Sequence, residues 1–128
     1  MEQAVQKLAA ICFILVGSSH IVRPRVWSQF FIHMSNKGEA ASFLNALLTL
    51  PLGVLIVAFH NVWTGAVPLT LTLIGWAYIV KSFIYFTFPK YGLRMLSGVT
   101  IEKSWMFVPP GVLMAVYGAL LLYTSLMN

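Results

Sequence analysis

The apolar stretch from Val67 to Phe88 limits the possible folds most, because it is long enough to cross a lipid bilayer. A hydrocarbon core about 30 Å thick needs about 20 helical residues. The stretch carries one charged residue, Lys81. Its Leu, Ile, Val and Phe residues favour insertion by about 0.3 to 0.6 kcal/mol each, and together they outweigh a lysine that costs about 3 kcal/mol at the bilayer centre. We therefore predict a transmembrane helix over residues 67–88.

Three further apolar runs predict transmembrane helices over residues 4–22, 40–59 and 109–127. The chain is 59% hydrophobic and only 9% charged, whereas soluble domains carry about 25% charged residues. Nearly all of its 128 residues would lie in or beside the bilayer, so no second domain fits. We expect an all-α membrane protein, in which residues 1–128 form a compact bundle of four transmembrane helices.

The first run also has features of a signal peptide. Leu8 to Val16 has the length of a signal-peptide hydrophobic region, and Val16-Gly17-Ser18 resembles a cleavage site. The apolar character continues to Val22, which favours a retained membrane helix. Cys12 is the only cysteine and has no partner for an internal disulfide, so it does not indicate a redox compartment.

Short amphipathic segments are expected at the membrane interface after the first and third helices. Arg23-Pro24-Arg25 ends the first helix, because the residue before a proline avoids helical geometry. Apolar residues then recur at helical spacing, which is typical of an interfacial helix. They are Trp27, Phe30, Phe31 and Met34. Pro89 ends the third helix in the same way, and residues 90–104 form a second basic connection.

The basic residues predict an orientation. Lys and Arg concentrate in the two connections that follow the first and third helices, whereas the turn at residues 60–66 has none. They are Arg23, Arg25, Lys37, Lys90, Arg94 and Lys103. Cytoplasmic loops are enriched in such residues, so we expect both termini to face away from the cytoplasm. The net charge of +5 comes mainly from these loops, and we expect it to meet anionic membrane lipid and not nucleic acid.

The two halves of the chain resemble each other weakly. Pro24 and Arg25 are repeated 65 positions later by Pro89 and Lys90. Either a parallel internal repeat or two independent helical hairpins would give this pattern.

Each predicted helix carries a stripe of small side chains, which allows helices in lipid to approach closely. Helical spacing near seven residues favours left-handed crossings. The stripes are Ala10 and Gly17; Ser42, Ala46, Thr49 and Gly53; Thr72, Gly75 and Ser82; and Gly111, Ala115 and Gly118. A bundle packed in this way leaves no room for an aqueous pore within one protomer, so a channel would have to form between protomers.

Five polar residues form the candidate site: Ser19, His20, Asn45, Thr49 and Lys81. All fall in the half of the bundle nearest the basic connections, where we expect them to converge. Such a donor-rich pocket suits an anion, a lipid head group or a quinone carbonyl. The alternative is hydrogen bonding between helices, worth about 0.6 to 1 kcal/mol per pair, with no ligand. Lys81 could also extend its side chain to the interface or pair with Glu39.

Signals for catalysis and for metal binding are weak. The sequence has no Gly-rich phosphate loop, no GxSxG motif and no paired carboxylates. It has no Asp, a single Cys and no HxxxH pair, so we expect neither a metal site nor a cofactor. These observations favour a protein that is not an enzyme.

The HNVW turn at residues 60–63, followed by GWAYIVK at 75–81 and Phe88-Pro89, resembles a group of short bacterial four-span integral membrane proteins of uncharacterised function. The resemblance covers His60 to Pro89. It implies a bacterial inner (plasma) membrane setting and nothing about activity.

Two hypotheses about function follow. The first is a non-enzymatic accessory protein or self-associating bundle that holds a membrane lipid or a quinone in an inner-leaflet groove beside Lys81. Its partners would be further copies of itself or a larger membrane complex. The second is a small homo-oligomeric transporter or channel for an anion or small solute, with Lys81 and His20 in the binding site.

Overall fold

The computed structural model describes residues 1–127, and these residues form helices and no strands, as expected. The elements in chain order are α1 (Glu2–Val22), α2 (Pro24–Ser35), α3 (Ala40–Phe59), α4 (Ala66–Thr87), α5 (Pro89–Leu96), the 3₁₀ helix η1 (Ser104–Phe107) and α6 (Val108–Met127). Within residues 1–127, four helical stretches are long and apolar enough to cross a membrane: α1, α3, α4, and η1 continued by α6. The four predicted spans agree with α1, α3, α4 and α6 to within two residues at each end. The chain thus has the architecture of a multi-pass membrane protein.

Prolines set two of the helix boundaries. α1 ends at Val22 and α4 ends at Thr87, in each case one residue short of an X-Pro bond. The residue before each proline has nearly the same backbone conformation, with φ −129° and ψ 56° at Arg23 and φ −125° and ψ 69° at Phe88. Pro24 and Pro89 then occupy the first positions of α2 and α5, where a missing N–H costs nothing. The chain therefore turns sharply out of each span.

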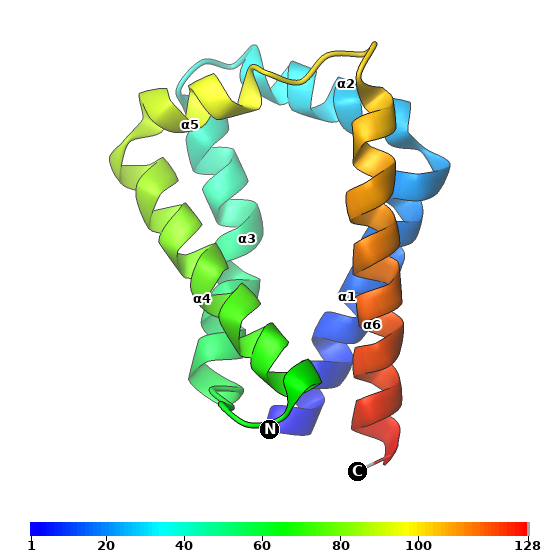
Figure 1. The fold of residues 1–128 in the computed structure, drawn as a ribbon. Coiled ribbons are helices and arrows are strands. Elements are labelled where there is room, and N and C mark those ends of the chain that lie inside the picture. Colours follow the sequence, from blue (N-terminus) through cyan, green and yellow to red (C-terminus); the bar gives the residue numbers. More distant parts are fainter. Residues whose placement is uncertain (128) are drawn as a thin grey trace.

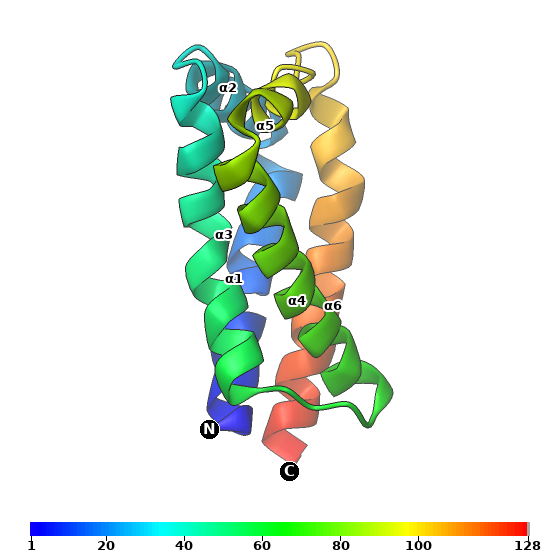
Figure 2. The same ribbon diagram turned by 90° about the vertical axis from the view of Figure 1, so that its left-hand side faces the viewer.

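The two short helices lie across one end of the bundle. Figures 1 and 2 show α2 and α5 roughly perpendicular to the spans, with both chain termini at the opposite end. This arrangement confirms the two segments after the first and third spans as helices. It also puts both basic connections at the end covered by α2 and α5, which we call the basic end.

The spans are arranged as two pairs, α1 with α6 and α3 with α4. Close approach within a pair depends on glycine. A Cβ atom added at Gly17 of α1 would lie 2.6 Å from the Gly111 carbonyl oxygen and 2.7 Å from the Ala115 nitrogen. Backbone thus packs on backbone, as expected where lipid supplies no hydrophobic force between helices. The small residues predicted at helix contacts are buried except Thr49 and Ala115, which are half-buried.

The two pairs meet at the end that holds the termini and diverge toward the basic end (Figure 1). Two hydrogen bonds connect them where they meet. Gln6 of α1 donates through Nε2 to His60 Nε2 at 2.8 Å, and the Tyr117 hydroxyl of α6 donates to the Val67 carbonyl at 2.8 Å. The four-helix bundle is therefore tightest within each pair.

The halves of the chain repeat the same contacts 65 positions apart. The Cβ position of Gly53 lies 3.1 Å from the Gly75 carbonyl oxygen, and that of Gly118 lies 2.9 Å from the Ala10 carbonyl oxygen. Gly53 and Gly118 are 65 positions apart, and so are Ala10 and Gly75. Equivalent positions in the two halves thus make equivalent close contacts, as a parallel internal repeat would.

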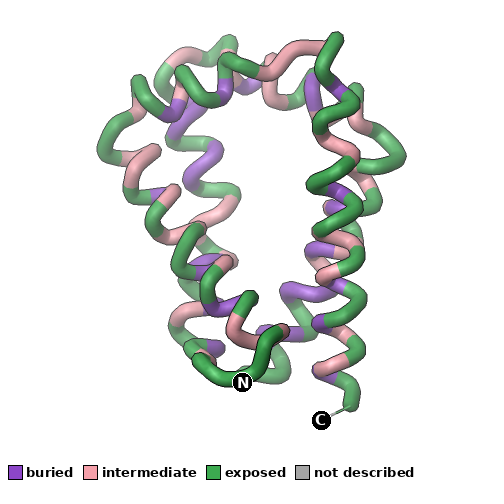
Figure 3. Tube along the Cα trace, in the orientation of Figure 1, coloured by how far each residue is buried: buried purple, intermediate pink, exposed green. Residues whose placement is uncertain are grey.

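Much of the surface of the spans is apolar. Buried segments in Figure 3 are confined to helix contacts, and exposed segments run along the outer sides of the spans. Large apolar side chains stand exposed on every span, including Leu15, Leu48, Phe83 and Leu113. A water-soluble protein rarely exposes contiguous apolar surface on this scale, so the surface fits a lipid environment.

Candidate functional site

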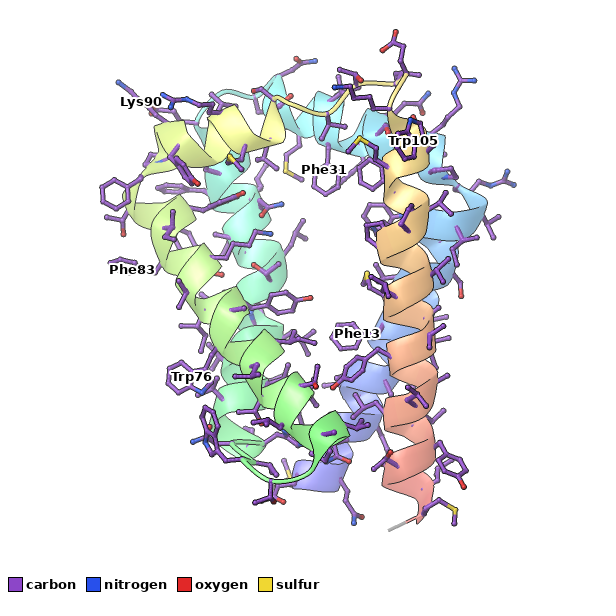
Figure 4. The ribbon with its side chains drawn as sticks, viewed as in Figure 1. Phe13, Phe31, Trp76, Phe83, Lys90 and Trp105 are labelled. Carbon is purple, nitrogen blue, oxygen red and sulfur yellow. The ribbon has the colours of Figure 1, made fainter. Side chains whose placement is uncertain are left out.

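One candidate site is a groove beside Lys81, on the outer side of α4 and beneath α5. Its volume is about 520 Å³. Trp76, which lines it, points away from the bundle centre in Figure 4. The lining residues are Leu73, Trp76, Ala77, Val80, Lys81, Ile84, Tyr85, Tyr91 and Met95. We call this the Lys81 groove.

The turn at Pro89 builds the groove. Because α5 starts directly at this proline and runs across the bundle end, it places Tyr91 and Met95 over the last turns of α4. Lys81 is half-buried among these apolar side chains, and its Nζ lies 5.4 Å from the centre of the Tyr85 ring. A cation over a ring face at this distance is attracted by the ring. The attraction to the ring thus offsets part of the hydration free energy that the ammonium group loses when it leaves water.

The groove has a defined chemical preference. Lys81 is the one charged side chain among the described residues that line it. An ammonium group donates hydrogen bonds and accepts none, so any ligand that bound it would have to present acceptor oxygens. The remaining walls suit the apolar body of an amphiphile.

Thr49 lies at the contact between α3 and α4, and Asn45 lies one helical turn before it on α3. The Thr49 and Ser82 hydroxyls are 3.2 Å apart, and Thr49 also donates to the carbonyls of Asn45 and Ala46 at 3.4 Å. These bonds match the alternative in which polar residues join helices without a ligand. Asn45 is 4% exposed, and its side-chain oxygen has no hydrogen-bond partner among residues 1–127.

Ser19 and His20 lie near the basic end of α1, against α2. The Trp27 indole donates to the Ser19 hydroxyl at 2.8 Å, and the Trp27 ring stacks on the His20 ring at 4.2 Å between centres. His20 lines a second cavity, described below, and Lys81 does not. The structure thus separates the candidate residues: Lys81 lines its groove, Thr49 meets α4 with Asn45 one turn away on α3, and Ser19 and His20 lie against α2. A ligand-binding role for any of them stays a prediction.

A cavity of about 400 Å³ lies between the two helix pairs at mid-height of the spans. All four spans contribute to it, through residues such as Cys12, Thr49, Tyr78 and Met114. Its other lining residues are Leu8, Phe13, Val16, Leu48, Pro51, Leu52 and Leu55. The lining is mainly apolar, so the divergence of the pairs produces a hydrophobic cavity.

The polar cluster Gln6, His60 and Thr72 was not predicted. His60 is fully buried, and Thr72 donates to the carbonyls of His60 and Val62 at 2.9 and 2.7 Å. Burial lowers the pKa of His60, while a hydrogen bond to its own backbone and the charge of Glu2 act in the opposite direction. The small-residue stripe identified Thr72 as a contact residue, but nothing in the sequence pairs Gln6 with a residue 54 positions away.

Metal-ligating residues are dispersed. Within residues 1–127, no group of three His, Cys, Asp or Glu side chains comes close enough to hold a metal ion.

Comparisons of the chain with protein family models, with curated proteins and with solved structures find no match. The resemblance to short bacterial four-span proteins is therefore supported by the four apolar helices and by no family match.

Proposed function

We propose that this protein is a non-enzymatic, multi-pass protein of the bacterial inner membrane that binds an amphiphilic lipid or quinone in the Lys81 groove. The observation that carries the proposal is the position of Lys81. It is the one charged side chain in an apolar, aromatic groove that opens on the outer side of a candidate membrane span.

The free-energy cost of placing Lys81 within the membrane supports a role in ligand binding. A lysine within a membrane span costs about 3 kcal/mol near the bilayer centre, and a charge in such a place is commonly functional. A ligand oxygen against Nζ would supply a charge-assisted hydrogen bond, which is about twice as strong as a neutral one. The groove volume of about 520 Å³ falls within the usual range for ligand sites, about 300 to 1,000 Å³.

The location of the groove favours an anionic lipid. α5 covers the groove at the basic end, where Lys90 and Arg94 add positive charge. If the basic connections face the cytoplasm, as the charge distribution predicts, this end meets the anionic inner leaflet. A lipid phosphate and a quinone carbonyl both present acceptor oxygens, so either head group fits Lys81. The lipid additionally complements the surrounding charge.

The test compares two variants that lose the same charge at the same end. Lys81→Met removes the groove ammonium, and Lys90→Met removes an exposed one. Binding of phosphatidylglycerol to the purified protein would be followed by native mass spectrometry. We expect Lys81→Met to weaken binding by about tenfold or more, the usual range for losing a charged hydrogen-bond partner, and Lys90→Met to change it little. Equal retention of lipid by Lys81→Met and the wild type would refute the proposal.

The same variants separate binding from transport. If Lys81→Met abolished anion flux through liposomes while lipid retention stayed at the wild-type level, the transporter hypothesis would replace the present one. Loss of lipid retention with no flux in the wild type would support binding. Mass photometry of the two variants would show whether the lipid also controls self-association.

A further inference from the structure

A second cavity lies at the basic end, next to the contact between α1 and α6. Its volume is about 440 Å³, and it is open on one side and lined by the end of α1, by α2, α5, η1 and the start of α6, and by the loop between α5 and η1. In Figure 4, Phe31 points from α2 into the space between the helix pairs. The lining residues are His20, Phe31, Met95, Gly98, Val99, Thr100, Lys103, Met106, Phe107 and Pro110. We call this the His20 cavity.

The His20 ring is held in place from several sides. Its Nδ1 is 2.7 Å from the Val16 carbonyl oxygen, and its face stacks on Trp27. Trp27 is fixed in turn by its hydrogen bond to Ser19. The Phe107 ring, 5.6 Å away, lies tilted against the imidazole. A polar group that is oriented in this way before a ligand arrives loses little conformational freedom on binding.

These contacts determine what His20 offers to a ligand. A carbonyl oxygen only accepts hydrogen bonds, so Nδ1 must carry the hydrogen in its bond to Val16. In a neutral imidazole the other nitrogen, Nε2, is then an acceptor. Nε2 makes no hydrogen bond within the described residues. His20, which lines the cavity, therefore carries an oriented acceptor that has no donor among residues 1–127.

The walls of the cavity suit a flat ring. Phe31 and Phe107 are stacked with centres 5.7 Å apart and planes at 12°, and Met95 and Met106 add flexible apolar surface. Aromatic side chains favour such offset contacts with other rings, and methionine adapts to their edges. Thr100 and Lys103 are the other polar groups of the lining. Apolar walls with a few placed polar groups are typical of small-molecule sites.

We propose that the His20 cavity binds an aromatic ring that bears a hydroxyl group, as in a phenol or a hydroquinone, and that this hydroxyl donates a hydrogen bond to His20 Nε2. The cavity shares Met95 with the Lys81 groove but does not include Lys81, and His20 adds an acceptor to the donors Thr100 and Lys103. Lys81 can only donate to a ligand, whereas neutral His20 accepts from one. The proposal therefore stands whether or not the Lys81 groove binds lipid.

The sharpest probe is one compound in two redox states. A short-chain benzohydroquinone carries two hydroxyl donors, and the corresponding benzoquinone has nearly the same shape but only acceptors. Binding of each to the full-length protein in nanodiscs would be measured by titration calorimetry at pH 8 without oxygen. We expect the hydroquinone to bind about tenfold more tightly than the quinone, because the oxidised form has no hydroxyl hydrogen to donate to His20 Nε2. Equal affinities, or tighter binding of the quinone, would overturn the proposal.

Variants assign the preference to His20. His20→Phe keeps a ring against Trp27 but removes the acceptor, so the two redox states should bind alike. His20→Gln provides an amide oxygen at a similar reach and should restore part of the preference, which also shows that a loss in His20→Phe does not come from misfolding. The matched control is His33→Phe. His33 is exposed and lines a smaller cavity of about 250 Å³ beneath α2.

The outcome of each variant decides between explanations. Retention of the redox preference in His20→Phe, or its equal loss in His33→Phe, would overturn the proposal. Lys81→Met should leave the preference unchanged, so failure of the lipid proposal is distinguishable from failure of this one. Comparing the affinities of a water-soluble phenol and of a hydroquinone with an isoprenoid tail shows whether the ligand comes from water or from the membrane. Tighter binding with the tail points to a membrane ligand, and equal binding points to a ligand from water.

Discussion

Gly17→Ala is expected to separate α1 from α6 and to destabilise the fold by about 2 to 3 kcal/mol. The added Cβ would lie 2.6 Å from the Gly111 carbonyl oxygen and 2.7 Å from the Ala115 nitrogen. Ordinary contacts of a Cβ atom begin near 3.4 Å, and backbone atoms cannot rotate away as a side chain does. The helices must therefore move apart by about 1 Å, which forfeits a quarter to a half of the dispersion energy at each displaced contact. Overpacking of this kind costs about 1 to 3 kcal/mol.

The assay is reversible unfolding in detergent micelles, followed by tryptophan fluorescence. Gly98→Ala is the matched control, because its Cβ would lie 3.6 Å from the Met95 carbonyl oxygen, an ordinary contact. We expect that control to change the free energy of unfolding by less than about 0.5 kcal/mol. Gly53→Ala should fall between the two, since its nearest contacts are 2.9 and 3.1 Å. If Gly17→Ala were as stable as Gly98→Ala, the close pairing of α1 with α6 would be wrong.

Three further predictions concern buried or half-buried polar side chains. His60 is buried with its pKa below the ordinary value of 6.5, so the folded state resists protonation, and the melting temperature should fall as the pH drops below about 6.5. His60→Gln should flatten this dependence, and an unchanged slope would contradict the burial of His60. A double-mutant cycle of Thr49→Val and Ser82→Ala should give a coupling of about 0.6 kcal/mol in micelles, and no coupling would mean that the two hydroxyls do not meet. Tyr117→Phe removes the bond to the Val67 carbonyl and should cost about 1 kcal/mol of unfolding free energy, whereas a neutral result would show that this bond does not join the helix pairs.

Much of the fold was predictable because two kinds of sequence signal are local. Apolar runs about 20 residues long define the spans, and prolines after charged or aromatic residues define the sharp turns at residues 24 and 89. The pairing of α1 with α6 was not predictable. Every span carries small residues, and nothing in one stripe specifies which other stripe it meets. The 65-residue spacing was visible in the sequence, but the equivalent contacts of Gly53 and Gly118 are seen only in the structure.

The sequence predicted how deep in the membrane the candidate residues lie, but not which way their side chains face. Ser19, His20 and Lys81 were expected at similar depth near the basic end, and depth follows from counting residues along a helix. Whether they share a pocket depends on how each helix is rotated about its axis. Lys81 borders the outer groove beneath α5, whereas His20 lies against Trp27 and Phe107. Residues from the loop before η1, such as Lys103, complete the His20 cavity, and no periodic pattern predicts their position.

The most direct test of the central claim is an experimental structure of the protein in nanodiscs that contain phosphatidylglycerol. We predict elongated density in the groove between α4 and α5, with a head-group oxygen about 3 Å from Lys81 Nζ, the usual length of a charge-assisted hydrogen bond. A groove without such density, or one filled by a second copy of the chain, would contradict the assignment of Lys81 to a lipid site.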